Sequence, residues 1–194
     1  MKARMILAVA AIVGSGMAMA QENRFSLGAE LALPMGDFGD AVGTGFGVTL
    51  GYEIPVGDNL GVMAQAGWMT FSGKDIDLGP FGTIEGPSFT AIPIQVGAKY
   101  YFTDNQEGFY AGLLTGVHLF TPEEGDGTTD FGVAPLLGYI IGENIDISLR
   151  YQMLFHKEEI EVIDPFTGNV LASESESTTN SYLGLRIAYM FGSR

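Results

Sequence analysis

The sequence predicts an all-β protein, an eight-stranded antiparallel up-and-down transmembrane β-barrel with short periplasmic turns and longer acidic outer loops. The first observation is that every second residue from Ile145 to Phe155 is large and apolar, while most residues between them are polar or charged. This is the pattern of a strand with one apolar face. Secondly, the pattern recurs about eight times, with glycines and polar residues on the opposite face. Thirdly, no segment after the N-terminal region is apolar for long enough to be a transmembrane helix, so closed strands must do any spanning.

Each strand follows the same alternation. In residues 44–54, for example, Phe46, Val48 and Leu50 alternate with Gly47 and Thr49. Residues 131–141 are the least clear, because both faces are apolar. We expect the strands at Phe25–Leu33, Thr44–Ile54, Leu60–Phe71, Phe89–Phe102, Phe109–Phe120, Phe131–Ile141, Ile145–Phe155 and Ser181–Phe191.

The connections between these strands alternate in length. The short ones are rich in Pro, Gly, Asp and Asn, as tight turns require. Short periplasmic turns and longer external loops are typical of outer-membrane barrels. The short turns are Pro55–Asn59, Thr103–Gly108 and Gly142–Asn144, and the long segments are Pro34–Gly43, Ser72–Ser88, Thr121–Asp130 and His156–Asn180.

Residues 1–20 have the pattern of a secretory signal peptide. Lys2 and Arg4 precede the apolar run Met5–Val13, and Ala18–Ala20 resembles a cleavage site with small residues. The run is too short for a membrane anchor, which needs about 20 residues. We therefore expect export through the inner membrane, with residues 21–194 forming the barrel domain in the outer membrane. The absence of cysteine excludes disulfides and a lipoprotein anchor.

Charge separates the interior from the loops. The formal net charge is −14, which argues against a nucleic-acid partner. An eight-stranded barrel is just wide enough for its own side chains, so inward-facing charges must be paired. The strand pattern predicts a balanced interior ion network in two clusters, with an ion pathway as the alternative interpretation. The central cluster is Glu30, Arg150 and Arg186, and the periplasmic cluster is Glu53, Lys99 and Asp146.

The long segments hold most of the remaining charge. Together they contain fifteen acidic residues, Asp130 among them, and two basic ones. We interpret them as solvated loops that repel neighbouring molecules. Divalent cations at Glu123–Gly127 or Asp75–Asp77 are an alternative, but neither stretch matches a calcium-loop template. No metal and no cofactor are therefore expected.

The last long segment contains a hairpin pattern. Ile160–Ile163 and Val170–Ser173 flank the turn-like stretch Asp164–Asn169. We expect the last two strands to continue beyond the lipid as a hairpin. Its free edge offers a binding surface for a strand of an extracellular protein.

Catalytic chemistry is weakly represented. A lipid-modifying enzyme would need a histidine, a hydroxyl and a carboxylate brought together. His118 is expected in the lumen, with Phe120 where a nearby serine would be needed. His156 is expected at the outer rim with Glu158 close by. Because no motif supports the complete set, we expect no enzyme.

Three segments resemble a known family. Phe25–Asp40 resembles the opening of the small outer-membrane β-barrel proteins, the porin-like OmpA/OmpX-type group, and Pro55–Leu60 resembles their first periplasmic turn. Leu183–Phe191 resembles the C-terminal strand that the barrel-assembly machinery recognises, although Gly192–Arg194 follow the terminal Phe here. The resemblance implies an assembly signal formed by Leu185, Ile187, Tyr189 and Phe191.

These observations lead to one main functional hypothesis and two alternatives. We expect a monomeric outer-membrane barrel with a filled lumen that acts structurally or through its outer loops in interaction or adhesion. A narrow channel or small-solute porin is the alternative, and a lipid-A-modifying enzyme is a distant one. A soluble lipid-binding barrel is the alternative fold. The expected partners are outer-membrane lipids including lipopolysaccharide, and the barrel-assembly machinery during insertion.

Overall fold

The computed structural model describes residues 23–192, apart from residues 78, 80, 81, 85, 87, 104, 105, 123–126 and 164–169. The signal peptide predicted for residues 1–20 lies outside the described residues.

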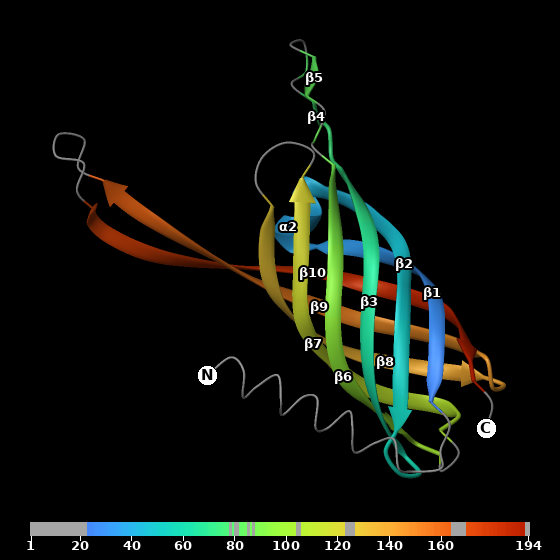
Figure 1. The fold of residues 1–194 in the computed structure, drawn as a ribbon. Helices are drawn as coiled ribbons and strands as arrows, with labels where there is room; N and C mark the ends of the chain where they lie inside the picture. The colour runs from blue at the N-terminus through green and yellow to red at the C-terminus, as the bar shows by residue number, and fades with distance from the viewer. Residues whose placement is uncertain are drawn as a thin grey trace.

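Eight long strands form one closed antiparallel barrel (Figure 1). The alternation of apolar and polar residues gives every strand one face for each side of the wall. The first and last strands close the barrel, with Cα partners running from Phe25 and Phe191 to Met35 and Ser181. The predicted up-and-down barrel is therefore confirmed. Its strands are β1 (Arg24–Met35), β2 (Val42–Pro55), β3 (Leu60–Gly73), β6 (Phe89–Tyr101), β7 (Gly108–Pro122), β8 (Thr128–Ile141), β9 (Ile145–Ile163) and β10 (Val170–Phe191).

Three short elements lie in segments that were expected to be loops. Helix α2 (Gly36–Ala41) connects β1 to β2, and β4 (Ile76–Asp77) pairs with β5 (Thr83–Ile84) between β3 and β6. None of the helices in the described part of the chain is long and apolar enough to cross a membrane. We call the end where residues 56–59, 102–107 and 142–144 connect strands the short-turn end, and the opposite end the long-loop end.

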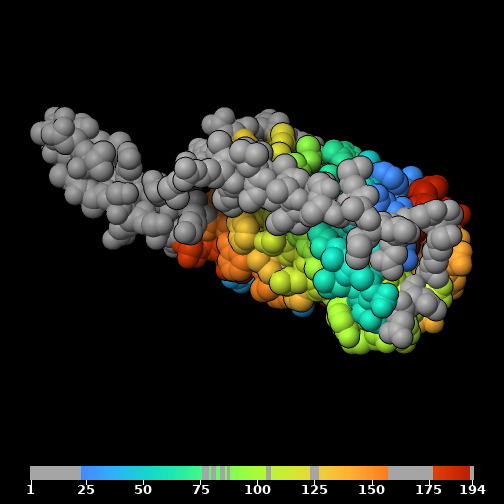
Figure 2. Space-filling view, turned by 60° about the horizontal axis from the view of Figure 1, so that its bottom comes forward, coloured from blue at the N-terminus to red at the C-terminus, as the bar shows by residue number. Residues whose placement is uncertain are grey.

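The outer wall of the barrel is apolar. Leu50 is 65% exposed, Leu149 45% and Ile187 53%, whereas Glu53, Arg150 and Arg186 of the same strands are buried. Figure 2 shows neighbouring strands packed side by side along one face of this wall. A wall of exposed aliphatic and aromatic side chains is what a lipid environment requires.

The interior is less polar than the alternation alone suggests. Two buried apolar clusters lie towards its two ends, and charged residues lie in the middle of the barrel and among the members of the cluster at the short-turn end. The difference arises because opposite walls of so narrow a barrel touch, and large inward side chains such as Tyr110 and Tyr182 fill the space. The cluster nearer the short-turn end is Met63, Tyr101, Tyr110, Leu114, Ala134, Leu136, Ile140 and Met190. The cluster nearer the long-loop end is Ala32, Val42, Met69, Phe71, Ala91, Leu154 and Tyr182.

The last two strands extend beyond the rest of the barrel. Pairing between β8 and β9 reaches Phe131 and Phe155, whereas β9 and β10 remain paired as far as Ile163 and Val170. The extension is a two-stranded ribbon that projects from the long-loop end (Figure 1). The hairpin expected from the sequence is therefore present, although its turn, residues 164–169, lies outside the described residues.

Candidate functional site

One part of the interior ion network lies towards the short-turn end. Lys99 Nζ is 3.1 Å from Glu53 Oε2 and 3.1 Å from Asp146 Oδ2. Arg186 Nη1 is 3.4 Å from the same Asp146 oxygen. Tyr101 donates a hydrogen bond to Glu53, and Tyr110 donates one of 2.5 Å to Asp146 Oδ1. Both buried carboxylates thus have a cation and a phenol as partners, as burial of a charge requires.

The second part lies in the middle of the barrel. Arg150 forms an ion pair with Glu30, and both side chains are almost completely buried. Its Nη1 and Nη2 donate hydrogen bonds of 3.2 Å to Gln95 Oε1 and to the Tyr182 hydroxyl. Gln95 in turn donates a 3.0 Å bond to Gln152. The guanidinium is therefore held by β1, β6 and β10 together.

Arg186 is placed differently from the sequence-based grouping. It is the Cα partner of Glu30 in the sheet, which suggested a central pair. Its guanidinium instead reaches Asp146, and Nε donates a 2.8 Å bond to Thr49 while Nη2 donates a 2.9 Å bond to Ser26. The arginine side chain is long enough to leave its own register position, so strand pairing alone does not identify its partner.

The ion network is buried inside the barrel. Three acidic and three basic side chains are present, and each of these residues is at most 5% exposed. Beside Lys99, Asp146, Arg150 and Arg186 there is a cavity of about 10 Å³. Such a space holds about one water molecule. The partners Gln95, Gln152, Tyr101, Tyr110 and Tyr182 were not singled out from the sequence, although all lie at inward positions of the alternation.

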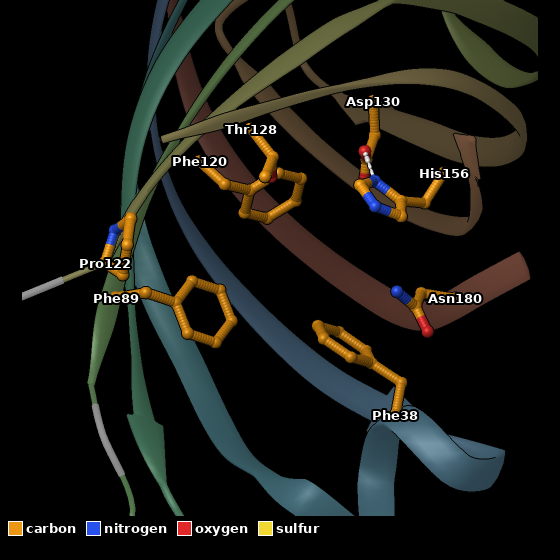
Figure 3. A pocket seen from close by; sticks show the side chains of 8 residues that line it. All are labelled: Phe38, Phe89, Phe120, Pro122, Thr128, Asp130, His156 and Asn180. Carbon is orange, nitrogen blue, oxygen red and sulfur yellow. Dashed lines mark hydrogen bonds and ion pairs between the residues drawn. The ribbon is translucent and has the colours of Figure 1, made fainter. Parts of the chain in front are cut away.

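A pocket of about 300 Å³ opens at the long-loop end of the barrel (Figure 3). We call it the mouth pocket. Within it, His156 Nδ1 is 2.6 Å from Asp130 Oδ1. Because an ionised carboxylate only accepts hydrogen bonds, the imidazole is the donor. The lining residues are Phe38, Phe89, Phe120, Pro122, Thr128, Asp130, His156 and Asn180.

Asp130 corrects one sequence-based expectation. It was assigned to an acidic outer loop, but it belongs to β8 and is only 4% exposed. His156 was expected near Glu158 and the loop serines, whereas its described partner is Asp130. The register of the hairpin formed by β8 and β9 could have predicted this pair. Phe131 pairs with Phe155, so extending the hairpin by one residue brings Asp130 opposite His156.

The other residues singled out from the sequence belong neither to the ion network nor to the described lining of the mouth pocket. Leu185, Ile187, Tyr189 and Phe191 lie on the outer face of β10, and their role as an assembly signal stays a prediction. His118 is buried and stacks on Phe120 with ring centroids 6.2 Å apart. Among the described residues no group of three or more potential ligand side chains could hold a metal ion. Residues 123–126, one of the cation-site alternatives, lie outside the described residues.

Solved structures with a similar fold are outer-membrane barrels. Ail, the attachment invasion locus protein of Yersinia pestis, has a TM-score of 0.53 and 13% identity, and the match covers 89% of this chain and 100% of that one. The N-terminal β-barrel domain of OprF from Pseudomonas aeruginosa has a TM-score of 0.50 and 13% identity, with 88% and 100% covered. OprG from the same organism has a TM-score of 0.50 and 13% identity, and the match covers 89% of this chain and 96% of that one.

At this level of identity, the structural likeness shows the fold alone. The comparison with curated protein sequences gave no match. The model of the outer membrane protein beta-barrel domain family, in contrast, matches residues 6–191. With its lipid-facing wall and polar ion network, the chain belongs to the outer membrane protein beta-barrel domain family.

Proposed function

We propose that this outer-membrane barrel keeps its interior filled and acts through contacts between its long-loop end and an extracellular protein. In barrels of this class the longer loops face the outside. The observation that carries the proposal is the ribbon formed by residues 156–163 of β9 and 170–180 of β10. Lipopolysaccharide around the wall and the barrel-assembly machinery during insertion are part of the same proposal.

The ribbon offers two strand edges. Pairing of β1 with β10 ends at Met35 and Ser181, and pairing of β8 with β9 ends at Phe131 and Phe155. In the described chain, each ribbon strand beyond these points therefore pairs only with the other. Its second edge carries backbone donors and acceptors that an added strand can satisfy.

The sequence of the ribbon segment favours a basic partner. Residues 156–180 contain six acidic residues and one lysine. Backbone pairing along an edge would supply affinity, while opposite charge would speed association and select the partner. We therefore propose an extended, basic segment of an extracellular protein as the occupant of the edge.

The filled interior supports an interaction role over a channel. Three acidic and three basic side chains of the interior are each at most 5% exposed, and the cavity beside them is only about 10 Å³, which supports a filled lumen. An open path would require Arg150 or Arg186 to leave partners that compensate its buried charge, at a cost of several kcal/mol.

A peptide-binding experiment tests the proposal. The probe is a synthetic ten-residue peptide of alternating Lys and Val, titrated against the protein in lipid nanodiscs. We expect binding that weakens as salt rises, and loss of binding when residues 157–177 are replaced by an Asn-Gly turn. A matched control shortens the loop at residues 74–88 and leaves the ribbon intact. Equal binding by the ribbon-deleted protein, checked for folding by heat-modifiable gel mobility, would refute the ribbon as the binding surface.

A further inference from the structure

The mouth pocket has one aromatic wall and one polar wall. Phe38 of α2, Phe89 of β6 and Phe120 of β7 form the aromatic wall, and their side chains point into the same space (Figure 3). The ring centroids of Phe38 and Phe89 are 6.3 Å apart, and those of Phe89 and Phe120 are 5.7 Å apart. Asp130, His156 and Asn180 face them across the pocket (Figure 3). Six elements of the chain therefore converge on this pocket.

The pocket has an apolar floor. Phe38, Phe89 and Phe120 pack against the apolar cluster at the long-loop end, which includes Met69, Phe71 and Tyr182. Phe71 stacks on Phe89 with ring centroids 5.1 Å apart. Below that cluster lies the buried ion network. A ligand would therefore enter from the long-loop side, and its apolar part would rest on ordered aromatic rings rather than on water.

Among the described residues that line the pocket, Asp130 is the one carboxylate and there is no Lys or Arg. Asp130 Oδ1 accepts the bond from His156. In the sequence, the segments that connect the strands at the long-loop end, residues 34–43, 72–88, 121–130 and 156–180, contain fifteen acidic residues against two basic ones.

These features select one class of ligand. The face of an aromatic ring attracts a cation within about 6 Å of its centroid, and a carboxylate binds an ammonium group through a charge-assisted hydrogen bond. A volume of about 300 Å³ lies at the small end of ligand pockets. An anion would meet the Asp130 carboxylate, and a neutral molecule would form no charge-assisted hydrogen bond with it.

We propose that the mouth pocket binds a small organic cation, a primary amine carrying an aromatic or alkyl body. The ammonium group pairs with Asp130, and the body packs between Phe38, Phe89 and Phe120. The acidic loops concentrate such cations at the mouth. The described lining of the pocket shares only His156 and Asn180 with the base of the ribbon and includes none of residues 157–177, so either proposal can fail while the other holds.

The test uses two probes that differ in charge alone at similar size. 4-Fluorophenethylamine and its neutral analogue 2-(4-fluorophenyl)ethanol are titrated by ¹⁹F NMR against the protein in nanodiscs, with empty nanodiscs subtracted. We expect the amine to bind at least about tenfold more tightly than the alcohol, the usual scale of a hydrogen bond to a charged group. Asp130→Asn should weaken the amine about tenfold and leave the alcohol unchanged. Phe120→Ala should weaken both probes.

A matched control removes a charge outside the pocket. Asp37 neighbours Phe38 in α2 and is exposed without lining the pocket, so Asp37→Asn should change amine affinity less than twofold. Equal affinity for amine and alcohol, unchanged amine affinity in Asp130→Asn, or no binding above empty nanodiscs would each overturn the proposal. The comparison of the two probes needs only the unmodified protein, and alcohol binding reports that Asp130→Asn is folded.

Discussion

Replacing Arg150 with methionine is expected to destabilise the barrel by about 3–5 kcal/mol. The substitution keeps much of the side-chain volume but leaves the Glu30 carboxylate without its ion-pair partner. The Arg150 side chain is 4% exposed and that of Glu30 is 0% exposed, so water cannot replace the lost cation. Removing one member of a buried pair costs about this amount because the other charge stays uncompensated.

Two further variants separate this charge effect from ordinary hydrogen-bond loss. Tyr182→Phe removes one acceptor of Arg150, at 3.2 Å, and keeps the ion pair. It should cost about 1–3 kcal/mol, the range for leaving one buried polar group unsatisfied. Glu30→Leu combined with Arg150→Met removes both charges and should recover most of the loss, because an apolar replacement for a buried pair is often nearly neutral.

Urea unfolding in lipid vesicles measures these free energies. Trp68, the one tryptophan of the chain, is 50% exposed on the outer wall, so its fluorescence reports transfer from lipid to water. Heat-modifiable gel mobility gives an independent folded fraction. A cost below about 1 kcal/mol for Arg150→Met would refute the buried pair as we describe it. The free energy lost by the double variant is compared with the losses of Glu30→Leu alone and Arg150→Met alone. A double variant that loses the sum of these two would refute coupling between the charges.

Three other predictions test the wall, the interior and the last strand. Leu149→Arg places a charge on the lipid face and should cost about 2–4 kcal/mol of unfolding free energy in vesicles near the midplane, while a cost under about 0.5 kcal/mol would contradict a lipid-facing Leu149. In planar bilayers the protein should show no steady conductance, because the side chains of the ion network are buried inside the lumen and are expected to block it. A sustained current proportional to voltage would argue for a channel. Phe191→Ser should lower the folded fraction in cells, measured by heat-modifiable mobility, because Phe191 ends the predicted assembly signal, and an unchanged fraction would remove Phe191 from that signal.

Most of the fold follows from alternation along single strands. The face of each residue between Ile145 and Phe155 is determined by period two, and eight such segments with short turns between them allow few closed arrangements. The strand ends were less predictable. The last two strands were expected to continue as a hairpin with short strands at Ile160–Ile163 and Val170–Ser173. The hairpin is present, but its pairing covers residues 156–163 and 170–180, with one register shift between Val170 and Ala172. Backbone hydrogen bonds between the two strands stabilise this extension, and they cannot be recognised from the amino-acid composition.

The candidate site was only partly predictable. All six charges expected inside the barrel are there, since an inward position can be read from the pattern. Their partners were harder to foresee, because the Arg186 guanidinium reaches Asp146 rather than its register neighbour Glu30. The mouth pocket was missed altogether. Phe38 comes from a six-residue helix with no strong sequence signature, and a pocket depends on how rings from separate elements meet.

The position of the Glu30 and Arg150 pair has a consequence for assembly. Glu30 lies on β1, while Arg150 lies on β9, across the seam where β1 meets β10. Likewise Ser26 of β1 and Thr49 of β2 accept bonds from Arg186 of β10. In a sheet in which β1 and β10 have not yet paired, these charges would be uncompensated and these polar groups would lack hydrogen-bond partners. Joining the termini therefore completes the electrostatic contacts and the backbone ladder together, which favours the finished cylinder over any partly curled intermediate.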